Sequence, residues 1–201
     1  MNIGADPYTV TLTACVAGDA AYTNIQYYWW NLGAGQPAPS GATLRTVTNT
    51  YGPGSYDVTL TVSNSLGMVT NSTRAACVRV VGANATAYVA TNGGNVYPYD
   101  TWAKAATNIP AAVDVVGLAI DLGAPSGLVL ASNGVHSLDR TIGLVKPITV
   151  RGPYGAAQTT VQKAAGAWNM QGFYLTHSNA ALDGLTISGF GTVGLRVGVA
   201  Q

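Results

Sequence analysis

Apolar and polar residues alternate along several short runs in the first eighty residues of the chain. In the run Tyr56–Ser63 one face carries Tyr56, Val58, Leu60 and Val62, and the other carries Asp57, Thr59, Thr61 and Ser63. This period of two is typical of a strand with one face in a core and one in water. Similar runs occupy Tyr8–Cys15, Ile25–Trp30, Ala42–Thr50 and Val69–Val81, with turn residues between them. The pattern predicts a β-sandwich over residues 1–82.

A helical spacing follows a short linker at residues 83–87. Asp100 is expected to cap a helix by accepting backbone N–H bonds. The apolar face of that helix would hold Trp102, Ala105, Ala106 and Ile109. Pro110 is tolerated in a first helical turn, so a second short helix is expected to begin there.

Short β segments separated by small turns fill the remainder of the chain. We expect them at residues 128–131, 147–150, 159–162, 172–175, 185–187 and 194–197. Segments without hairpin symmetry suit a solenoid, in which each coil buries its apolar side only by stacking on a neighbour. The coils run up to Gln201, so this solenoid is expected to be open at its C-terminal end. The whole chain is expected to be all-β.

The composition narrows the choice of partners. Charged residues make up 8% of the 201 residues, against roughly 25% in ordinary globular proteins. With a net charge of +1 and no basic cluster, the chain lacks the clustered Lys and Arg that nucleic-acid binding needs. Asp114 and Asp121 interrupt the longest apolar region, Ala111–Ala131, so no membrane span is expected.

The first eighty residues also resemble PKD domains, which are immunoglobulin-like modules of extracellular proteins. Pro53–Leu60 matches the motif Pro-Gly-x-Tyr-x-Val-x-Leu in full, and Asn49-Thr50-Tyr51 stands where PKD domains have His-Thr-Tyr. The Trp30–Gly35 turn lacks both acids of the family's Trp-Asp-Phe-Gly-Asp-Gly motif. The resemblance implies an extracellular or cell-surface spacer or binding module for residues 1–82.

Residues 83–201 resemble the start of right-handed parallel β-helix proteins of the pectate-lyase-like class. The resemblance rests on Pro98–Trp102, Ala105–Asp114, Lys146–Gly152 and Leu182–Ile187. It implies a short right-handed parallel β-helix with an N-terminal helical cap. The class contains lyases, hydrolases, adhesins and inert scaffolds, so the resemblance does not assign an activity.

The candidate catalytic groups are sparse, and we expect no enzyme activity. The chain has no glutamate, and no two aspartates stand at i and i+2, where one strand face would hold both. The alternative is a remnant of a polysaccharide lyase or glycosidase. His136 and His177 are expected beside turns, bonded to backbone, although a metal pair is conceivable. We expect no cofactor and no metal.

Cys15 and Cys77 both fall within the predicted sandwich. Two readings are open, a pair of buried free thiols or a disulfide. We favour the disulfide, because disulfides form in extracellular modules.

Contact candidates lie at the two ends of the chain. Alternation sends one of Trp29 and Trp30 into the core and the other outward, and Tyr28 lies beside them. An exposed aromatic there would contact another subunit or a sugar ring. At the open solenoid end the candidates are Leu195, Val197 and Val199. These residues predict a non-catalytic extracellular structural protein that assembles with itself into a layer, fibre or matrix. The alternative is a carbohydrate-binding or polysaccharide-degrading surface module cut off before its active coils.

Overall fold

The computed structural model describes residues 1–15, 24–191 and 193–198. The chain forms two compact units, Met1–Val80 and Val81–Gln201. The predicted division stood at residue 82, next to the point where the structure divides the chain.

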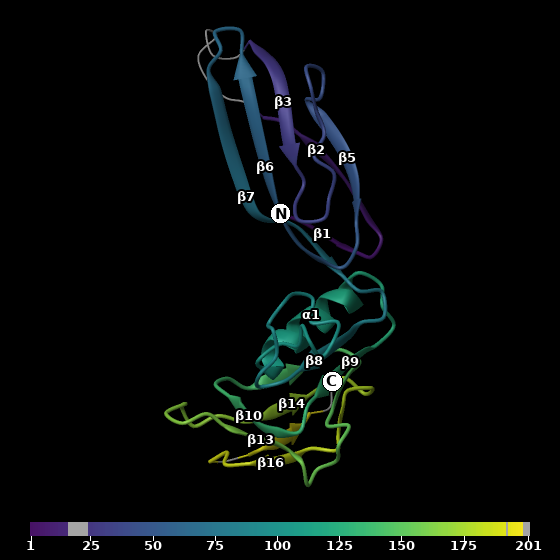
Figure 1. Ribbon diagram of the computed structural model, residues 1–201. Coiled ribbons are helices and arrows are strands. Elements are labelled where there is room, and N and C mark those ends of the chain that lie inside the picture. The colour runs from purple at the N-terminus through teal and green to yellow at the C-terminus, as the bar shows by residue number, and fades with distance from the viewer. Residues whose placement is uncertain (16–23, 192, 199–201) are drawn as a thin grey trace. The chain divides into compact units, whose positions relative to one another are not determined.

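The N-terminal unit is built from two sheets (Figure 1). The larger has the order β1-β7-β6-β3-β4, and the smaller pairs β2 with β5. The pairs β3–β6, β6–β7 and β2–β5 are antiparallel. The strand bounds are β1 Asn2–Ala5, β2 Tyr8–Thr13, β3 Ile25–Asn31, β4 Ser40–Gly41, β5 Thr46–Tyr51, β6 Gly54–Asn64 and β7 Val69–Val81.

One apolar cluster with residues from both sheets forms the core of this unit, which confirms the predicted sandwich. Its buried members are Val10, Ala14, Tyr28, Trp30, Leu32, Val47, Tyr51, Val58, Val62, Cys77, Val78 and Val80. The alternation of the sequence accounts for this packing, since Val58 and Val62 of β6 are buried while Ser55 and Asp57 of the same strand are exposed.

The C-terminal unit contains one helix and three parallel sheets. Its elements are β8 Thr86–Val89, α1 Ile109–Asp121, β9 Gly127–Ala131, β10 Gly134–Leu138, β11 Ile142–Leu144, β12 Ile148–Arg151, β13 Thr159–Lys163, β14 Phe173–Leu175, β15 Ala181–Asp183, β16 Thr186–Ser188 and β17 Leu195–Val197. The first sheet has the order β15-β12-β9-β8, the second β10-β13-β16 and the third β11-β14-β17. From β9 onward the chain therefore visits the three sheets in turn, three times over (Figure 1).

Side chains at the same register position stack in columns through this unit. One column is Val129, Val150 and Leu182 in the first sheet. In the third sheet Ile142, Phe173 and Leu195 form a column, and Leu144, Leu175 and Val197 form another. Parallel pairing in register brings similar side chains together, so each strand buries its apolar residues against the equivalent residues of the next strand.

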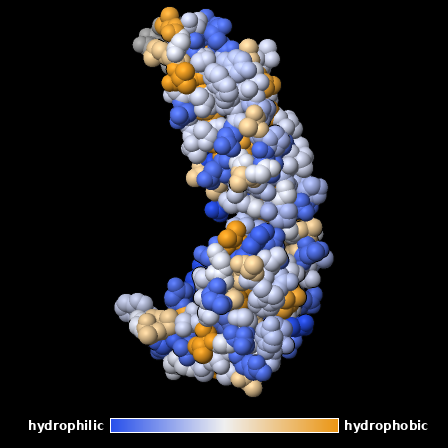
Figure 2. Space-filling view, viewed as in Figure 1, coloured by the Kyte–Doolittle hydropathy of each residue, from blue (hydrophilic) through white to orange (hydrophobic). Residues whose placement is uncertain are grey.

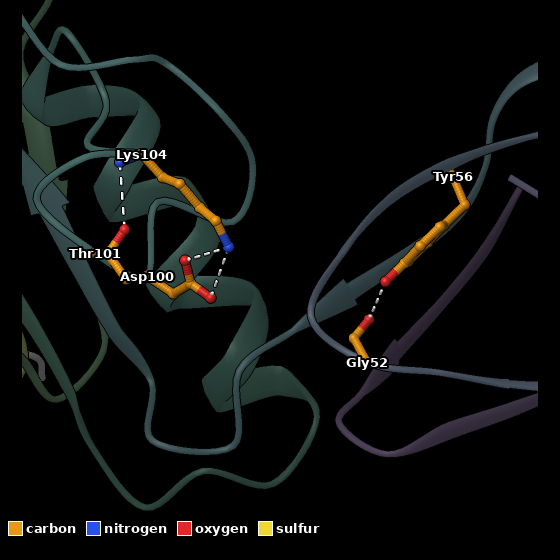
Figure 3. Close-up of polar contacts among 5 residues, drawn as sticks. All are labelled: Gly52, Tyr56, Asp100, Thr101 and Lys104. Carbon is orange, nitrogen blue, oxygen red and sulfur yellow. Dashed lines mark hydrogen bonds and ion pairs between the residues drawn. The ribbon is translucent and has the colours of Figure 1, made fainter. Parts of the chain in front are cut away.

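Of the two predicted helices, the one expected to begin at Pro110 is present, and the one expected after Asp100 is not found among the described residues. A single helix, α1, runs from Ile109 to Asp121, and its N-cap is Asn108, whose side-chain oxygen accepts a bond from Ala111 N at 2.9 Å. Asp100 lies in a turned segment and pairs instead with Lys104 (Figure 3). Asn108 caps the helix because it directly precedes the Ile109-Pro110 start, where the first N–H groups lack partners. In the part of the chain that the structure describes, no helix has the length and apolar character needed to cross a membrane.

Six of the described strands lay outside the predicted segments: β1, β4, β8, β10, β11 and β15. In β10 the two buried positions hold His136, which is 2% exposed, and Leu138, while Val135 is exposed, so this strand lacks a clear apolar alternation. The strands β11 and β15 have three residues each, too short to show a period.

Candidate assembly surfaces

The aromatic strand β3 has one face in the core and one in solvent. Trp30 is 5% exposed and its indole N–H donates to Leu44 O at 2.8 Å, and Tyr28 is buried beside it. Trp29 is 40% exposed. Tyr28 and Trp30 are therefore removed from the contact candidates, because the period of two turns both into the sandwich core.

Trp29 lies on the outer face of the larger sheet of the sandwich. Its ring centroid is 4.5 Å from that of Tyr27, and in register it faces Thr61 on β6 and Ser40 on β4. An aromatic pair among hydroxyl groups offers an apolar surface with hydrogen-bonding groups around it.

The second candidate surface is the outer edge of the last strand in each parallel sheet. The strands β15, β16 and β17 each have one paired neighbour in their sheets. In β17 Leu195 is 42% and Val197 71% exposed, although both continue columns whose earlier members are buried. Val199 lies outside the described residues. This edge presents unpaired backbone groups together with the open ends of core columns.

Both cysteines are free thiols, which corrects the predicted disulfide. Cys15 is exposed and Cys77 is buried. Cys15 follows β2 on the side of Thr9, Thr11 and Thr13, whereas Ala14 points into the core. The Cys77 side chain reaches the core beside a β-bulge opposite Asp57, whose carboxylate accepts from Ala76 N at 2.7 Å. The Cys15 thiol therefore faces solvent, whereas the Cys77 thiol lies in the core.

Four aspartates of the C-terminal unit are held in ion pairs. Arg140 lies 2.9 Å from Asp114, Lys146 2.6 Å from Asp121, Arg151 2.7 Å from Asp183 and Lys104 3.0 Å from Asp100 (Figure 3 shows the last pair). The pairs of Asp114 and Asp121 tie α1 to the segments on either side of β11, and that of Asp183 ties β15 to β12. Residues 1–15, 24–191 and 193–198 contain no group of three or more potential ligands that would hold a metal ion.

The two histidines have different settings. His177 stands beside a turn, and its Nδ1 accepts a bond from Asn179 N at 3.1 Å, which is the backbone contact expected for it. His136 also bonds to backbone as expected, with Nε2 2.9 Å from Ser132 O, but it lies within β10, so its predicted loop position is wrong.

A groove that sequence analysis missed lies between α1 and the segment joining β11 to β12. Its volume is about 440 Å³, and it is lined by Val113, Asp114, Gly117, Leu118, Asp121, Gly143, Val145, Lys146 and Ile148. Lys146 donates to Gly117 O at 3.0 Å and so fixes one side of the groove to the helix. Its lining residues stand far apart in the sequence, and only packing brings them together.

The hydropathy of the surface fits the low charge of the chain. On the face shown in Figure 2, hydrophobic residues stand singly or in small groups among hydrophilic ones in both units. Scattered exposed hydrophobic residues are normal on a protein surface. The candidate assembly surfaces are therefore Trp29, on the outer face of its sheet, and the unpaired edge of β17.

Comparison with curated proteins and with solved structures gave no match. A family comparison gave one for the N-terminal unit. The match covers the strands of the sandwich and ends at Cys77 in β7. PKD domains are typical of extracellular proteins. Residues 2–77 of this chain match the PKD domain family.

Proposed function

We propose that this chain is a non-catalytic extracellular structural protein that assembles with itself through the open edge of its C-terminal unit. In this proposal the N-terminal unit is a PKD-like spacer, and the C-terminal unit is a short right-handed parallel β-helix capped by α1. The successive visits to three parallel sheets support the β-helix, and right-handed crossovers are the rule between parallel strands.

The observation that carries the proposal is the exposure of the β17 edge. Leu195 and Val197 extend columns that bury Phe173 and Leu175, yet their own outer sides face solvent. A further coil laid on β15, β16 and β17 would pair their backbone groups and bury these side chains. The ion-paired carboxylates support a structural role, because each is already engaged by a cation.

The test is the state of association of the purified chain over a range of concentrations. Light scattering and electron microscopy should show concentration-dependent growth into filaments or sheets. The variant Val197→Lys places a charge on the edge and should suppress growth, as charged residues do on natural edge strands. The control Val135→Lys changes an equally apolar, exposed residue on β10, away from that edge. A chain that stays monomeric at high concentration would contradict the proposal.

A second candidate function is carbohydrate binding at Trp29. The exposed indole pairs with Tyr27 and has hydroxyl neighbours, which suits stacking on a sugar ring. Affinity electrophoresis in gels containing pectin, alginate or xylan tests it. Retardation that is lost in Trp29→Ala supports the second candidate, and equal mobility in all gels rejects it.

A further inference from the structure

Trp168 is the most exposed large hydrophobic residue among those the structure describes. It lies on the loop at residues 164–172, between β13 and β14, and 91% of its surface is exposed. In Figure 1 this loop projects from the edge of the unit. A tryptophan can bury about 150–250 Å², so leaving one in water forgoes a large gain from burial.

The loop that carries Trp168 is braced on both sides. Before it, Lys163 Nζ donates to Ala167 O at 2.9 Å. After it, Met170 packs against the core and Thr141 Oγ1 donates to Gln171 O at 2.9 Å. These contacts hold the indole out from the surface before any partner arrives, which lowers the entropic cost of binding.

The groove beside α1 has the size and polarity to receive such a side chain. Val113, Leu118 and Val145 give it apolar walls, and its volume is about 440 Å³. Gly117 keeps it open, since a Cβ there would meet only Lys146 atoms, at 3.8 and 3.9 Å. The carboxylates of Asp114 and Asp121 stand among its lining residues and can accept an indole N–H.

We propose that Trp168 of one copy inserts into the α1 groove of a second copy. The Trp168 side chain, here called the knob, and the α1 groove are different surfaces of the same unit. The contact is therefore heterologous, and it continues from copy to copy unless it closes a ring. The inference rests on the proposed self-assembly but uses a surface separate from the β17 edge.

A second copy is the occupant because the chain itself carries both complementary parts. Membrane attachment would call for free basic residues around the indole. Lys163, at the start of the loop, is bonded to Ala167 O, and Arg140, beside the Thr141 that contacts the loop, is paired with Asp114. A single inserted side chain buries far less area than a standard interface, which buries about 1,600 Å². The isolated contact is therefore weak, and it gains strength when it is repeated along an assembly.

Sedimentation velocity over a concentration series tests the contact, with three variants. Trp168→Ala removes the knob without disturbing the core, and Gly117→Leu fills the groove. Val145→Glu puts a charge over the apolar walls from an exposed position, so it tests the groove even where Gly117→Leu does not fold. Each should weaken self-association about tenfold or more. The matched control Tyr154→Ala, at another exposed aromatic residue of the same unit (53% exposed), should not.

Mixing gives the sharper result. Both variants are made in the Val197→Lys background, which suppresses growth through the β17 edge. Trp168→Ala keeps its groove and Val145→Glu keeps its knob, so together they should form a one-to-one dimer that does not grow, although neither forms the Trp168 contact with itself. Association that Val197→Lys abolishes and Trp168→Ala leaves intact would overturn this inference and keep the proposed function. A monomeric wild-type chain would overturn both. Retardation by pectin, alginate or xylan that Trp168→Ala alone removes would reassign the loop to a saccharide.

Discussion

In the N-terminal unit, exposed threonines of β2 and β5 face one another across the ladder, whereas in the C-terminal unit ion pairs connect one layer to the next. The three hydroxyl pairs are Thr9–Thr50 at 2.8 Å, Thr11–Thr48 at 2.9 Å and Thr13–Thr46 at 3.2 Å. Arg140–Asp114, Lys146–Asp121 and Arg151–Asp183 are the ion pairs of the layers. A nearly uncharged surface thus coexists with a few charges placed where helix and coils must be held together.

The apolar cores of the two units also differ in how they are arranged. The sandwich closes its core between two sheets, so its apolar residues face a partner sheet. The parallel unit extends its core along columns, and the two columns of the third sheet end in the exposed residues Leu195 and Val197. Among the described residues, the three parallel sheets of the second unit therefore each end in a strand, β15, β16 or β17, with one paired neighbour.

The largest expected effect comes from the buried member of the tryptophan pair. Trp30→Ala should cost the N-terminal unit about 3–5 kcal/mol, because it leaves a cavity and removes the bond to Leu44 O. Trp29→Ala, one residue away but exposed, should cost less than about 1 kcal/mol. Hydrogen exchange read by mass spectrometry should show lost protection in β3, β5 and β6 and unchanged protection in β12 and β13. Equal loss in both units would mean that they do not fold independently.

The helix cap gives the next effect. Asn108→Ala should destabilise α1 by about 1 kcal/mol, since the first-turn N–H of Ala111 loses its acceptor. Asp100→Ala removes only the ion pair with Lys104 and should cost about 0.5 kcal/mol or less. Chemical denaturation followed by circular dichroism compares the two. A larger loss in Asp100→Ala would restore the helix start that the sequence suggested.

Lys146 tests the ion pairs between layers. Lys146→Met keeps the apolar stem but removes the contacts to Asp121 and to Gly117 O, and we expect a loss of about 0.5–1 kcal/mol at low salt. The pair is partly exposed, so the difference from wild type should shrink as salt is added. A parallel measurement on Thr11→Val, in a hydroxyl pair of the sandwich, should show no salt dependence. A salt-independent loss in Lys146→Met would assign its role to packing.

Tyr51 gives a pH-dependent effect confined to the sandwich. Burial raises the pKa of Tyr51 above its ordinary value of 10.0. Above about pH 10 the unfolded chain loses this proton first, so the folded state binds more protons and its stability falls as the pH rises. Tyr51→Phe should reduce that alkaline fall and change stability little at pH 7, because the hydroxyl has no hydrogen-bond partner.

Tyr56→Phe is the matched control for Tyr51→Phe. Its hydroxyl donates to Gly52 O at 3.0 Å, as Figure 3 shows, so its loss should cost about 1 kcal/mol at neutral pH. An alkaline profile unchanged by Tyr51→Phe would show that another group titrates there.

The smallest effect on stability is expected from modification of Cys15. Iodoacetamide should label Cys15 in the folded chain without reductant and leave Cys77 unlabelled until the chain unfolds. The denaturation midpoint of the labelled protein should not move, because the Cys15 side chain faces solvent. Failure of both thiols to react, even after unfolding, would show a disulfide and contradict the structure.

Sequence alternation was sufficient to predict β2, β3, β5, β6 and β7 of the sandwich and the opposite orientation of the two tryptophans. The same alternation also accounts for the exposed Cys15, which continues the threonine side of β2 and so faces away from the core. The inward turn of Cys77 depends on the bulge opposite Asp57, and nothing local in the sequence marks it.

The candidate sites could be predicted only in part, for a physical reason. Leu195 and Val197 stand in an apolar run that predicts a strand, and they are exposed because β17 is the outer strand of its sheet. The α1 groove joins residues some thirty positions apart, and Trp168 in a turn-rich segment reads equally well as a core residue. The exposure of Trp168 depends on tertiary contacts such as Thr141 to Gln171 O, which no sequence period encodes.

The corner between the second and third sheets carries connections of very different length. Residues 139–141 join β10 to β11, and residues 164–172 join β13 to β14, yet the strands on either side keep their register. The pairing of the strands therefore does not depend on the length of the connection at this corner. New segments can be inserted at this corner, by evolution or by grafting, without redesign of the scaffold, and a peptide displayed there would be repeated at regular intervals along any assembly the chain forms.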